Sequence, residues 1–235
     1  MDKKFQNIRK VIKMNSNSCK DIMTLWNIVC KNTKNPKENY DYIPIVKDNV
    51  VSSLYVKEGN EYKYYDINND YFINENDDLL FVLEKLNKLY NYNKITFLIV
   101  GNPNKQIGVI NHSDLNNLPF IHNMWDIFYN FEIKLTDYLK DKYNSEYIKS
   151  KLYGNALKSY TKDKNNNQEL EPIFYLSLTK KICLYNQLNQ TNKIKVNTKF
   201  RNNMAHPKSK ARVIDNKSEI PKLYKTMDEI DKFLS

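Results

Sequence analysis

The sequence predicts an α+β N-terminal half followed by an all-α C-terminal half. In the first half, residues 42–46 and 49–56 are short β-branched and aromatic runs separated by a turn, which is typical of a hairpin. From residue 118 onward, apolar residues recur with helical spacing and no convincing strand interrupts them. A chain of 235 residues can bury one sizeable core or two small ones, and we expect two domains, 1–117 and 118–235.

A second strand pair in the first half repeats the order of the first. A helix predicted over 77–89 leads to strands 95–100 and 106–110, which flank the turn GNPNK. The earlier segment 18–32, SCKDIMTLWNIVCKN, is expected to be the matching helix before the first strand pair. The two units therefore indicate an internal repeat.

The two copies are separated by an insertion, residues 57–71, with the sequence KEGNEYKYYDINNDY. We expect it to be a surface loop. Its aromatic residues are Tyr62, Tyr64, Tyr65 and Tyr71. Exposed tyrosines could stack on a base, but packing onto the neighbouring copy is the favoured interpretation.

The second half begins with a helix of about six or seven turns, LPFIHNMWDIFYNFEIKLTDYLKDKY, with Pro119 near its first turn. Further helices are predicted over 145–160, 170–188 and 219–234, and another across the opening stretch of the chain. The polar run 161–169, TKDKNNNQE, is expected to be a loop. This pattern predicts an all-α bundle that the first long helix joins to the N-terminal half.

Cysteine usage and hydropathy exclude several classes of protein. The three cysteines, Cys19, Cys30 and Cys183, are too few and too scattered for a disulfide framework, and no Cys/His spacing matches a zinc site. We therefore expect no metal and a reducing cytoplasmic location. The N-terminus lacks an apolar signal-peptide core, and no run of about eighteen apolar residues occurs, so we expect no membrane partner.

The net charge of +10 is unevenly distributed. Residues 1–117 carry 16 Lys/Arg and 14 Asp/Glu, whereas residues 118–235 carry 21 and 13. Within the second half, seven basic residues occur between 193 and 212 without a carboxylate, namely Lys193, Lys195, Lys199, Arg201, Lys208, Lys210 and Arg212. This run is either a solvated basic face or a binding site for a polyanion such as RNA.

The repeat resembles a pair of CBS (cystathionine β-synthase) domains, the sensor modules that usually bind adenosyl ligands. The second copy, FLIVGNPNKQIGVINHSDL, follows the family's order of strand, turn, glycine-led strand and closing Asp. The resemblance implies that Asp114 accepts hydrogen bonds from ribose hydroxyls, with Asn111 in place of the usual Thr. An adenine nucleotide or adenosyl compound is then the regulatory ligand. A plain helix N-cap is the alternative role for Asp114.

The first copy departs from this family pattern. Gly59 occupies the position at which the closing Asp should fall, and serine replaces the glycine of the second strand. At most one of the two clefts is therefore expected to hold a nucleotide.

The C-terminal half resembles the HEPN superfamily. Its ribonuclease members carry Arg, a polar residue, three further residues and His, and here FRNNMAHP supplies Arg201, Asn202 and His206, followed by Pro207. The resemblance covers roughly 118–235 and implies a homodimer with facing motifs.

These residue types suit RNA cleavage without a metal. Attack of a ribose 2′-hydroxyl on the adjacent phosphate needs a group that titrates near neutrality, which His206 supplies, and a fixed positive charge, which Arg201 supplies. Lys199, Lys208, Lys210 and Arg212 are the expected RNA-binding residues. The two motif residues lie about 140° apart around an ideal helix, so a bend near Pro207 or a cleft shared by two chains is expected.

A structural interpretation of the motif stays open. Arg201 could pair with Glu132 or Asp137 of the long helix, and His206 could cap a helix end. His112 and His122 are assigned to the surface or to packing rather than to catalysis.

The sequence as a whole predicts a nucleotide-regulated, metal-independent endoribonuclease of a defence or toxin type, with RNA as substrate. An antitoxin partner is left open. The alternative function is a nucleotide-sensing adaptor or RNA-binding module with a non-catalytic bundle.

Overall fold

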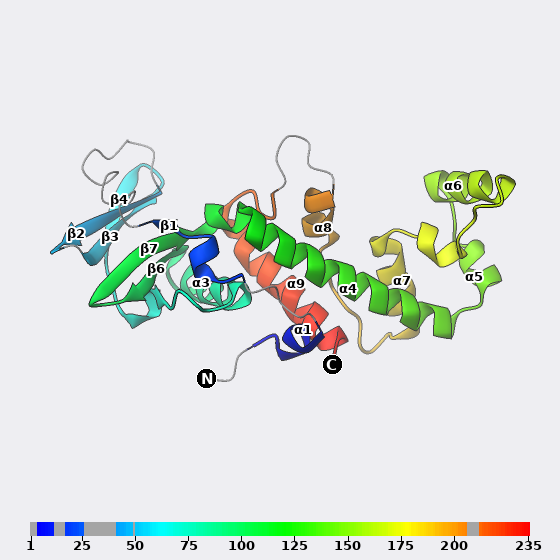
Figure 1. The fold of residues 1–235 in the computed structure, drawn as a ribbon, viewed down its shortest axis with the longest axis horizontal. Helices are drawn as coiled ribbons and strands as arrows, with labels where there is room; N and C mark the ends of the chain where they lie inside the picture. The colour runs from blue at the N-terminus through cyan, green and yellow to red at the C-terminus, as the bar shows by residue number, and fades with distance from the viewer. Residues whose placement is uncertain (1–3, 12–16, 26–40, 49, 206–211) are drawn as a thin grey trace.

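The computed structural model describes residues 4–11, 17–25, 41–48, 50–205 and 212–235. The molecule is elongated: the strands lie at one end, and the helix α4 (Leu118–Lys142) runs from them towards the small helices at the other end (Figure 1). The strands are β1 (Thr24–Leu25), β2 (Tyr42–Lys47), β3 (Val50–Glu58), β4 (Glu61–Asp66), β5 (Phe72–Ile73), β6 (Phe97–Asn102) and β7 (Lys105–Asn111).

The remaining elements are helical. The α-helices are α1 (Gln6–Val11), α3 (Leu79–Asn93), α4, α5 (Ser145–Lys149), α6 (Gly154–Asn165), α7 (Leu178–Leu188), α8 (Thr198–Ala205) and α9 (Ile220–Phe233). The 3-10 helices are η1 (Cys19–Asp21), η2 (Asn69–Tyr71), η3 (His112–Asn116), η4 (Pro172–Tyr175) and η5 (Lys217–Glu219).

The strands of the described residues form two sheets. One has the order β1-β7-β6-β5, in which only the β5–β6 pair is parallel, and the other is the antiparallel meander β2-β3-β4. Strand β6 is the apolar centre of the first sheet, because Phe97, Leu98, Ile99 and Val100 are all buried. The buried Gln106 joins the sheets, since its Oε1 accepts a hydrogen bond of 2.7 Å from Val51 N.

The predicted fold class, an α+β CBS pair followed by an all-α HEPN-like bundle, is wrong. The fold is mixed α/β, and the two strand pairs are not copies of one unit. The second pair, β6 and β7, lies beside the parallel strand β5, whereas the first pair, β2 and β3, continues into the antiparallel strand β4. In the predicted helix over 18–32, the described residues form η1 and β1, and residues 26–32 lie outside the described part.

The insertion after β3 is not a loop, because residues 61–66 form the edge strand β4. Neighbouring side chains of this strand lie on opposite faces: Tyr65 packs against the core, while Tyr64 is 54% exposed and meets Tyr55 edge to face at 5.8 Å. The sequence did not predict this strand, because three of its six residues are charged and its burial does not alternate.

The helix α3 confirms the pattern predicted over 77–89. Asp78 is its N-cap and accepts a hydrogen bond from Phe81 N, while the predicted apolar residues Leu79, Val82, Leu83, Leu86 and Leu89 are buried. The guanidinium of Arg9, on α1, donates two hydrogen bonds to the Asp78 carboxylate, of 2.9 and 3.1 Å. This bidentate pair fixes α1 to the start of α3.

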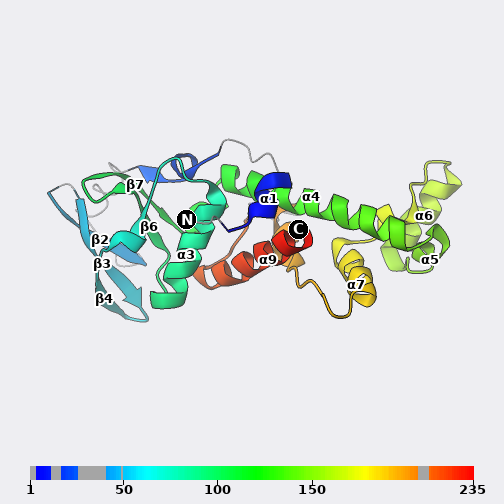
Figure 2. The same cartoon turned by 90° about the horizontal axis from the view of Figure 1, so that it is seen from below.

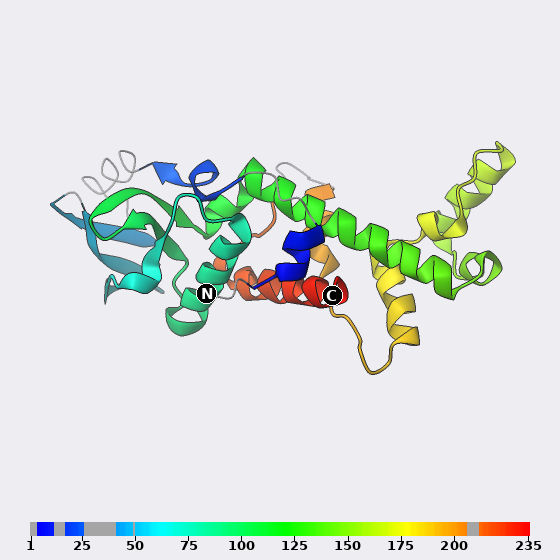
Figure 3. The same ribbon diagram turned by 60° about the horizontal axis from the view of Figure 1, so that its bottom comes forward.

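The second half is helical but is not a separate compact bundle. The helix α4 has 25 residues, about seven turns as predicted, and α9 packs against α3 and α1 of the first half (Figures 2 and 3). The Asn116 side chain accepts hydrogen bonds from Val213 N and Ile214 N, and α9 places Asp231 where it accepts one from Ile8 N. One apolar core therefore continues across the predicted boundary at residue 118.

Two further predictions in this half are corrected. The helix over 145–160 is broken, because α5 ends at Lys149 and α6 begins at Gly154, which has a φ of +56°. The expected loop over 161–169 is helical up to Asn165, because Tyr160 is buried and the Tyr175 hydroxyl donates to Asp163 at 2.8 Å. These two anchors fix a segment that has no apolar periodicity of its own.

The close approach of β1 to β7 predicts that Gly108→Ala lowers the free energy of unfolding by about 1 to 3 kcal/mol. A Cβ atom at this position would lie 2.7 Å from Thr24 O and 2.8 Å from the Met23 sulfur. Urea denaturation measures the effect. Since the contact with the Thr24 backbone remains, the same loss is expected in a Met23→Ala background, and a loss below about 0.5 kcal/mol would contradict this packing.

Candidate nucleic-acid interface

The residues of the Arg-Asn motif lie on the short helix α8. Phe200 and Met204, one turn apart, are buried and hold α8 against α4. This packing leaves Asn202 exposed and places Arg201 at the edge of the contact, with a side chain that is 28% exposed. His206 follows the end of α8 and lies outside the described residues.

Arg201 has two partners on α4. Its Nη2 lies 3.4 Å from Glu132 Oε2, and its Cζ lies 5.5 Å from the centroid of the Trp125 ring. The ion pair with Glu132 is the structural alternative that the sequence analysis left open. An arginine held at its edge by a carboxylate and at its face by an indole has a fixed orientation.

The second oxygen of Glu132 binds a cation from a third helix. Lys181, on α7, is 4% exposed, and its Nζ lies 2.9 Å from Glu132 Oε1. Glu132 therefore bridges a buried ammonium and a partly exposed guanidinium. The three groups, Lys181, Glu132 and Arg201, carry a net charge of +1, so the carboxylate does not cancel the positive charge at the motif.

Sequence reasoning missed Lys181 and the role of Trp125. Lys181 lies among the apolar positions of its helix, next to the buried residues Leu178, Ile182 and Leu184. A lysine on the apolar face of a helix requires a buried counter-charge. Its position in the sequence could therefore have indicated a buried ion pair. The sequence could not show which carboxylate would supply it.

Of the predicted RNA-binding residues, one forms ion pairs, one is exposed and two are not described by the structure. Lys199 Nζ lies 2.5 Å from Glu219 and 3.1 Å from Asp215, and these hydrogen bonds raise the pKa of Lys199. Arg212 is exposed. Lys208 and Lys210 lie outside the described residues. The basic run of the sequence is thus partly neutralised by acidic residues that follow it in the chain.

Asp114 and Asn111 form a local turn at the start of η3. The carboxylate of Asp114 accepts a 2.7 Å hydrogen bond from Asn111 N, and the Asn111 side chain accepts from Ser113 N and its hydroxyl. Asp114 is 9% exposed, and burial raises its pKa to about 6 against the opposing effect of that backbone hydrogen bond. The N-cap of η3 is therefore Asn111, and Asp114, the third residue of that helix, completes the capping box instead of being the N-cap itself. Ribose binding stays a prediction.

The histidines expected to lie at the surface or in packing positions are both described. His122 is exposed on α4. His112 is half-buried, with its Nδ1 3.1 Å from the Thr96 hydroxyl, and burial lowers its pKa.

Two other features, a metal cluster and a membrane-spanning helix, are absent from the described part of the chain. No cluster of three or more His, Cys, Asp or Glu residues suited to a metal ion occurs there. None of its helices combines the length and the apolar character needed to span a bilayer. No protein-family model, curated protein or solved structure matches the sequence or the fold.

The bridging role of Glu132 predicts that Glu132→Gln lowers the free energy of unfolding by about 2 to 4 kcal/mol, because the buried ammonium of Lys181 loses its counter-charge. Adding Lys181→Met should recover most of this loss, since methionine keeps the apolar stem without the charge. Denaturant titration of both variants measures the effect.

The matched control for Glu132→Gln is Glu171→Gln, which breaks an exposed pair with Lys140 and should cost less than about 1 kcal/mol. Equal losses for the two Glu→Gln variants would show that Glu132 is not a buried bridge.

The buried carboxyl of Asp114 predicts a specific pH dependence. Its pKa in the folded protein, about 6, lies above the ordinary value of 3.8, so the folded state binds more protons between pH 4 and 6. The stability that this group contributes is present below pH 4 and is lost as the pH rises to 6, by about 2 to 3 kcal/mol.

Asp114→Asn has no carboxyl to ionise, so this loss should be absent from the variant. Between pH 4 and pH 7 the free energy of unfolding should therefore fall more in the parent than in the variant. Urea denaturation at several pH values tests it. If the free energy of unfolding changes with pH in the same way in the parent and in Asp114→Asn, the raised pKa of Asp114 is contradicted.

Proposed function

We propose that the chain is a metal-independent endoribonuclease whose active residues are Arg201, Asn202 and His206. One observation carries the proposal: Arg201 is oriented by Glu132 and Trp125 at the surface of α8, directly before the exposed Asn202. Its guanidinium has five N–H donors and uses one nitrogen on Glu132, so the others are available for the two oxygens of a phosphate.

The chemistry follows from these groups. The ribose 2′-oxygen forms a bond to phosphorus while the bond to the 5′-oxygen breaks. His206 takes the proton of the 2′-hydroxyl, and the leaving 5′-oxygen takes a proton from the imidazolium or from water. Arg201 stabilises the charge that develops on the phosphoryl oxygens. The products are a 2′,3′-cyclic phosphate and a 5′-hydroxyl, and no metal is required.

A homodimer belongs to this proposal. One face of α4 carries a row of exposed apolar side chains one or two turns apart, Leu118, Trp125, Tyr129 and Ile133, which are between 36% and 65% exposed. Pairing of two copies through this row would bury it and would bring two copies of Arg201 towards one cleft, because Arg201 contacts Trp125. Since the substrate is RNA, we expect the protein to act in the cytoplasm.

A non-catalytic RNA-binding role is the second candidate. It is favoured by the net positive charge of the Lys181, Glu132 and Arg201 cluster, which suits a phosphate whether or not the strand is then cleaved. The regulatory adenine ligand and the antitoxin stay predictions, since the contacts of Asp114 give them no specific support.

The proposal predicts that the purified protein cleaves RNA in EDTA and that Arg201→Ala or His206→Ala lowers the rate by about 10²-fold or more. Arg201→Lys should restore little, because an ammonium cannot bind two phosphate oxygens in the same geometry. Cleavage of a labelled RNA, with analysis of the 3′ ends, measures both effects.

The control variant for this assay is Lys88→Ala, which removes an exposed lysine paired with Asp70 near the sheets and should leave the rate unchanged. Activity that depends on added metal, or that survives His206→Ala, would exclude the mechanism. Binding of RNA without cleavage would favour the second candidate.

A further inference from the structure

The end of α4 away from the sheets carries a small lobe, residues 143–180, which contains α5, α6, η4 and the start of α7 (Figure 1). We call it the distal lobe. The helix α6 contacts η4, and the rings of Tyr160 and Tyr175 meet edge to face at 5.4 Å to hold them together. The lobe is therefore a packed part of the molecule.

A cleft of about 470 Å³ lies between α6 and the start of α7. Its polar lining consists of Lys151, Tyr153, Asn155, Ser159, Ser177 and Lys180, together with Tyr175, and includes no carboxylate. Lys151 and Lys180 are half-buried, and neither forms an ion pair with a carboxylate among the described residues. The cleft thus holds two cations that lack a counter-charge.

Each of these lysines lies over an aromatic ring. Lys180 Nζ is 5.4 Å from the centroid of Tyr153, and Lys151 Nζ is 4.6 Å from that of Tyr147. Tyr153 is 69% exposed at the mouth of the cleft. An exposed ring beside unpaired cations offers a stacking surface for a base next to a binding position for its phosphate.

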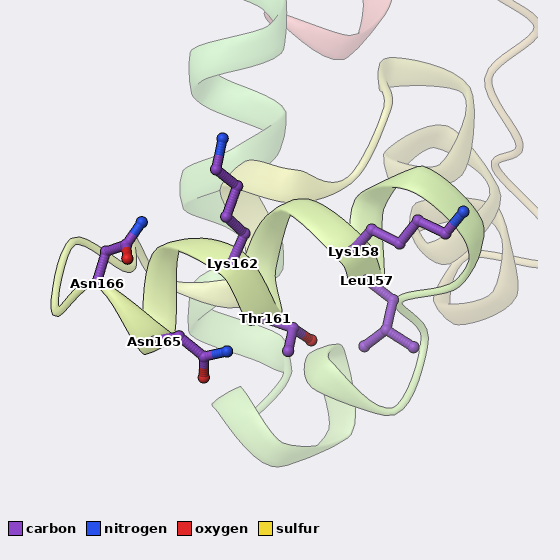
Figure 4. Close-up of a pocket in the computed structure, with 6 residues that line it drawn as sticks. All are labelled: Leu157, Lys158, Thr161, Lys162, Asn165 and Asn166. Atoms are coloured by element: carbon purple, nitrogen blue, oxygen red, sulfur yellow. The ribbon is translucent and has the colours of Figure 1, made fainter.

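The outer face of α6 continues this surface. Figure 4 shows the residues that line a second hollow of about 630 Å³, Leu157, Lys158, Thr161, Lys162, Asn165 and Asn166. All six are exposed, and again none is acidic. The acidic residue within α6, Asp163, accepts the hydroxyl of Tyr175. Two adjacent surfaces of the distal lobe therefore combine lysines and amides without a carboxylate.

We infer that the distal lobe binds single-stranded RNA, with a phosphate between Lys151 and Lys180 and a base stacked on Tyr153. The charge of the lining is complementary to a polyanion, and the amide groups of Asn155 and its neighbours can bond base edges or sugars. A single strand is required because a paired base cannot present its face to Tyr153. The inference extends the proposed function, since the lobe would hold the strand that Arg201 contacts, but binding itself does not depend on cleavage.

The test uses the full-length protein and a fluorescent RNA of about 12 nucleotides in which every 2′-hydroxyl is methylated, so that internal attack is blocked. Fluorescence anisotropy at several salt concentrations gives the affinity and its salt dependence. Lys151→Ala/Lys180→Ala should weaken binding at least about 10-fold and lower the slope of log affinity against log salt by about 1.4. Tyr153→Ala should weaken binding about fivefold or more.

The matched control is Lys20→Ala/Lys105→Ala, which removes one exposed lysine of η1 and one of β7, outside the distal lobe, and should leave the affinity almost unchanged. Lys158→Ala/Lys162→Ala, on exposed positions of α6, gives a second variant of the lobe and should also weaken binding. Thermal unfolding of each variant checks that it is folded.

Equal affinities for the lobe variants and the control would overturn the inference. So would binding of pyrophosphate at the cleft without binding of the RNA, which would indicate a small phosphorylated ligand instead. Loss of RNA binding in the lobe variants, in a protein that cleaves no RNA, would support RNA binding by the distal lobe and would refute the proposed nuclease activity. Cleavage and affinity that are both unaffected by the lobe variants would support the proposed nuclease and would refute RNA binding by the distal lobe.

Discussion

The arrangement of the helical half depends on one carboxylate, Glu132. It is placed on α4 between Lys181 of α7 and Arg201 of α8, so three helices meet at its two oxygens. Because Lys181 is almost fully buried, this pair is needed to keep an ammonium in the core. Arg201 uses the remaining oxygen and the face of Trp125, and its orientation follows from a contact whose first purpose is structural.

The same constraint explains how a structural and a functional role can coincide in Arg201. A lone arginine on α8 would sample many rotamers, whereas a guanidinium fixed at one edge presents its other donors in a defined direction. The excess positive charge of the three-group cluster remains at the surface. This arrangement favours binding of a phosphate, and it would do so whether or not His206 then cleaves the chain.

The spacing of apolar residues predicted the helices and strands better than it predicted which of them pair with one another. The helix α3, the strands β6 and β7, and the long helices α4 and α9 were all foreseen, because their apolar residues recur at intervals of two or three to four. The repeat was not confirmed, since an equal order of elements does not determine which strands pair. The strand β4 was missed because its pairing with β3 along the whole strand is not visible in the sequence of the segment. The end of α6 was missed because it depends on a tertiary contact, the hydrogen bond from the Tyr175 hydroxyl to Asp163.

The charge pattern likewise located basic residues in the sequence but did not show which carboxylates they would contact. A count along the sequence put the basic surface at 193–212, but Lys199 is neutralised by Asp215 and Glu219, which lie 16 and 20 residues further on. Lys151 and Lys180 of the distal lobe are about 30 positions apart, and folding brings them to one cleft whose lining includes no carboxylate.

The central claim is that Glu132 and Trp125 fix the side chain of Arg201, and NMR of the side-chain protons tests it most directly. The ring current of Trp125 should shift the Arg201 δ protons upfield of those of the exposed Arg212, and both Trp125→Ala and Glu132→Gln should reduce this difference. Shifts for Arg201 that equal those of Arg212 in the unmodified protein would contradict the account.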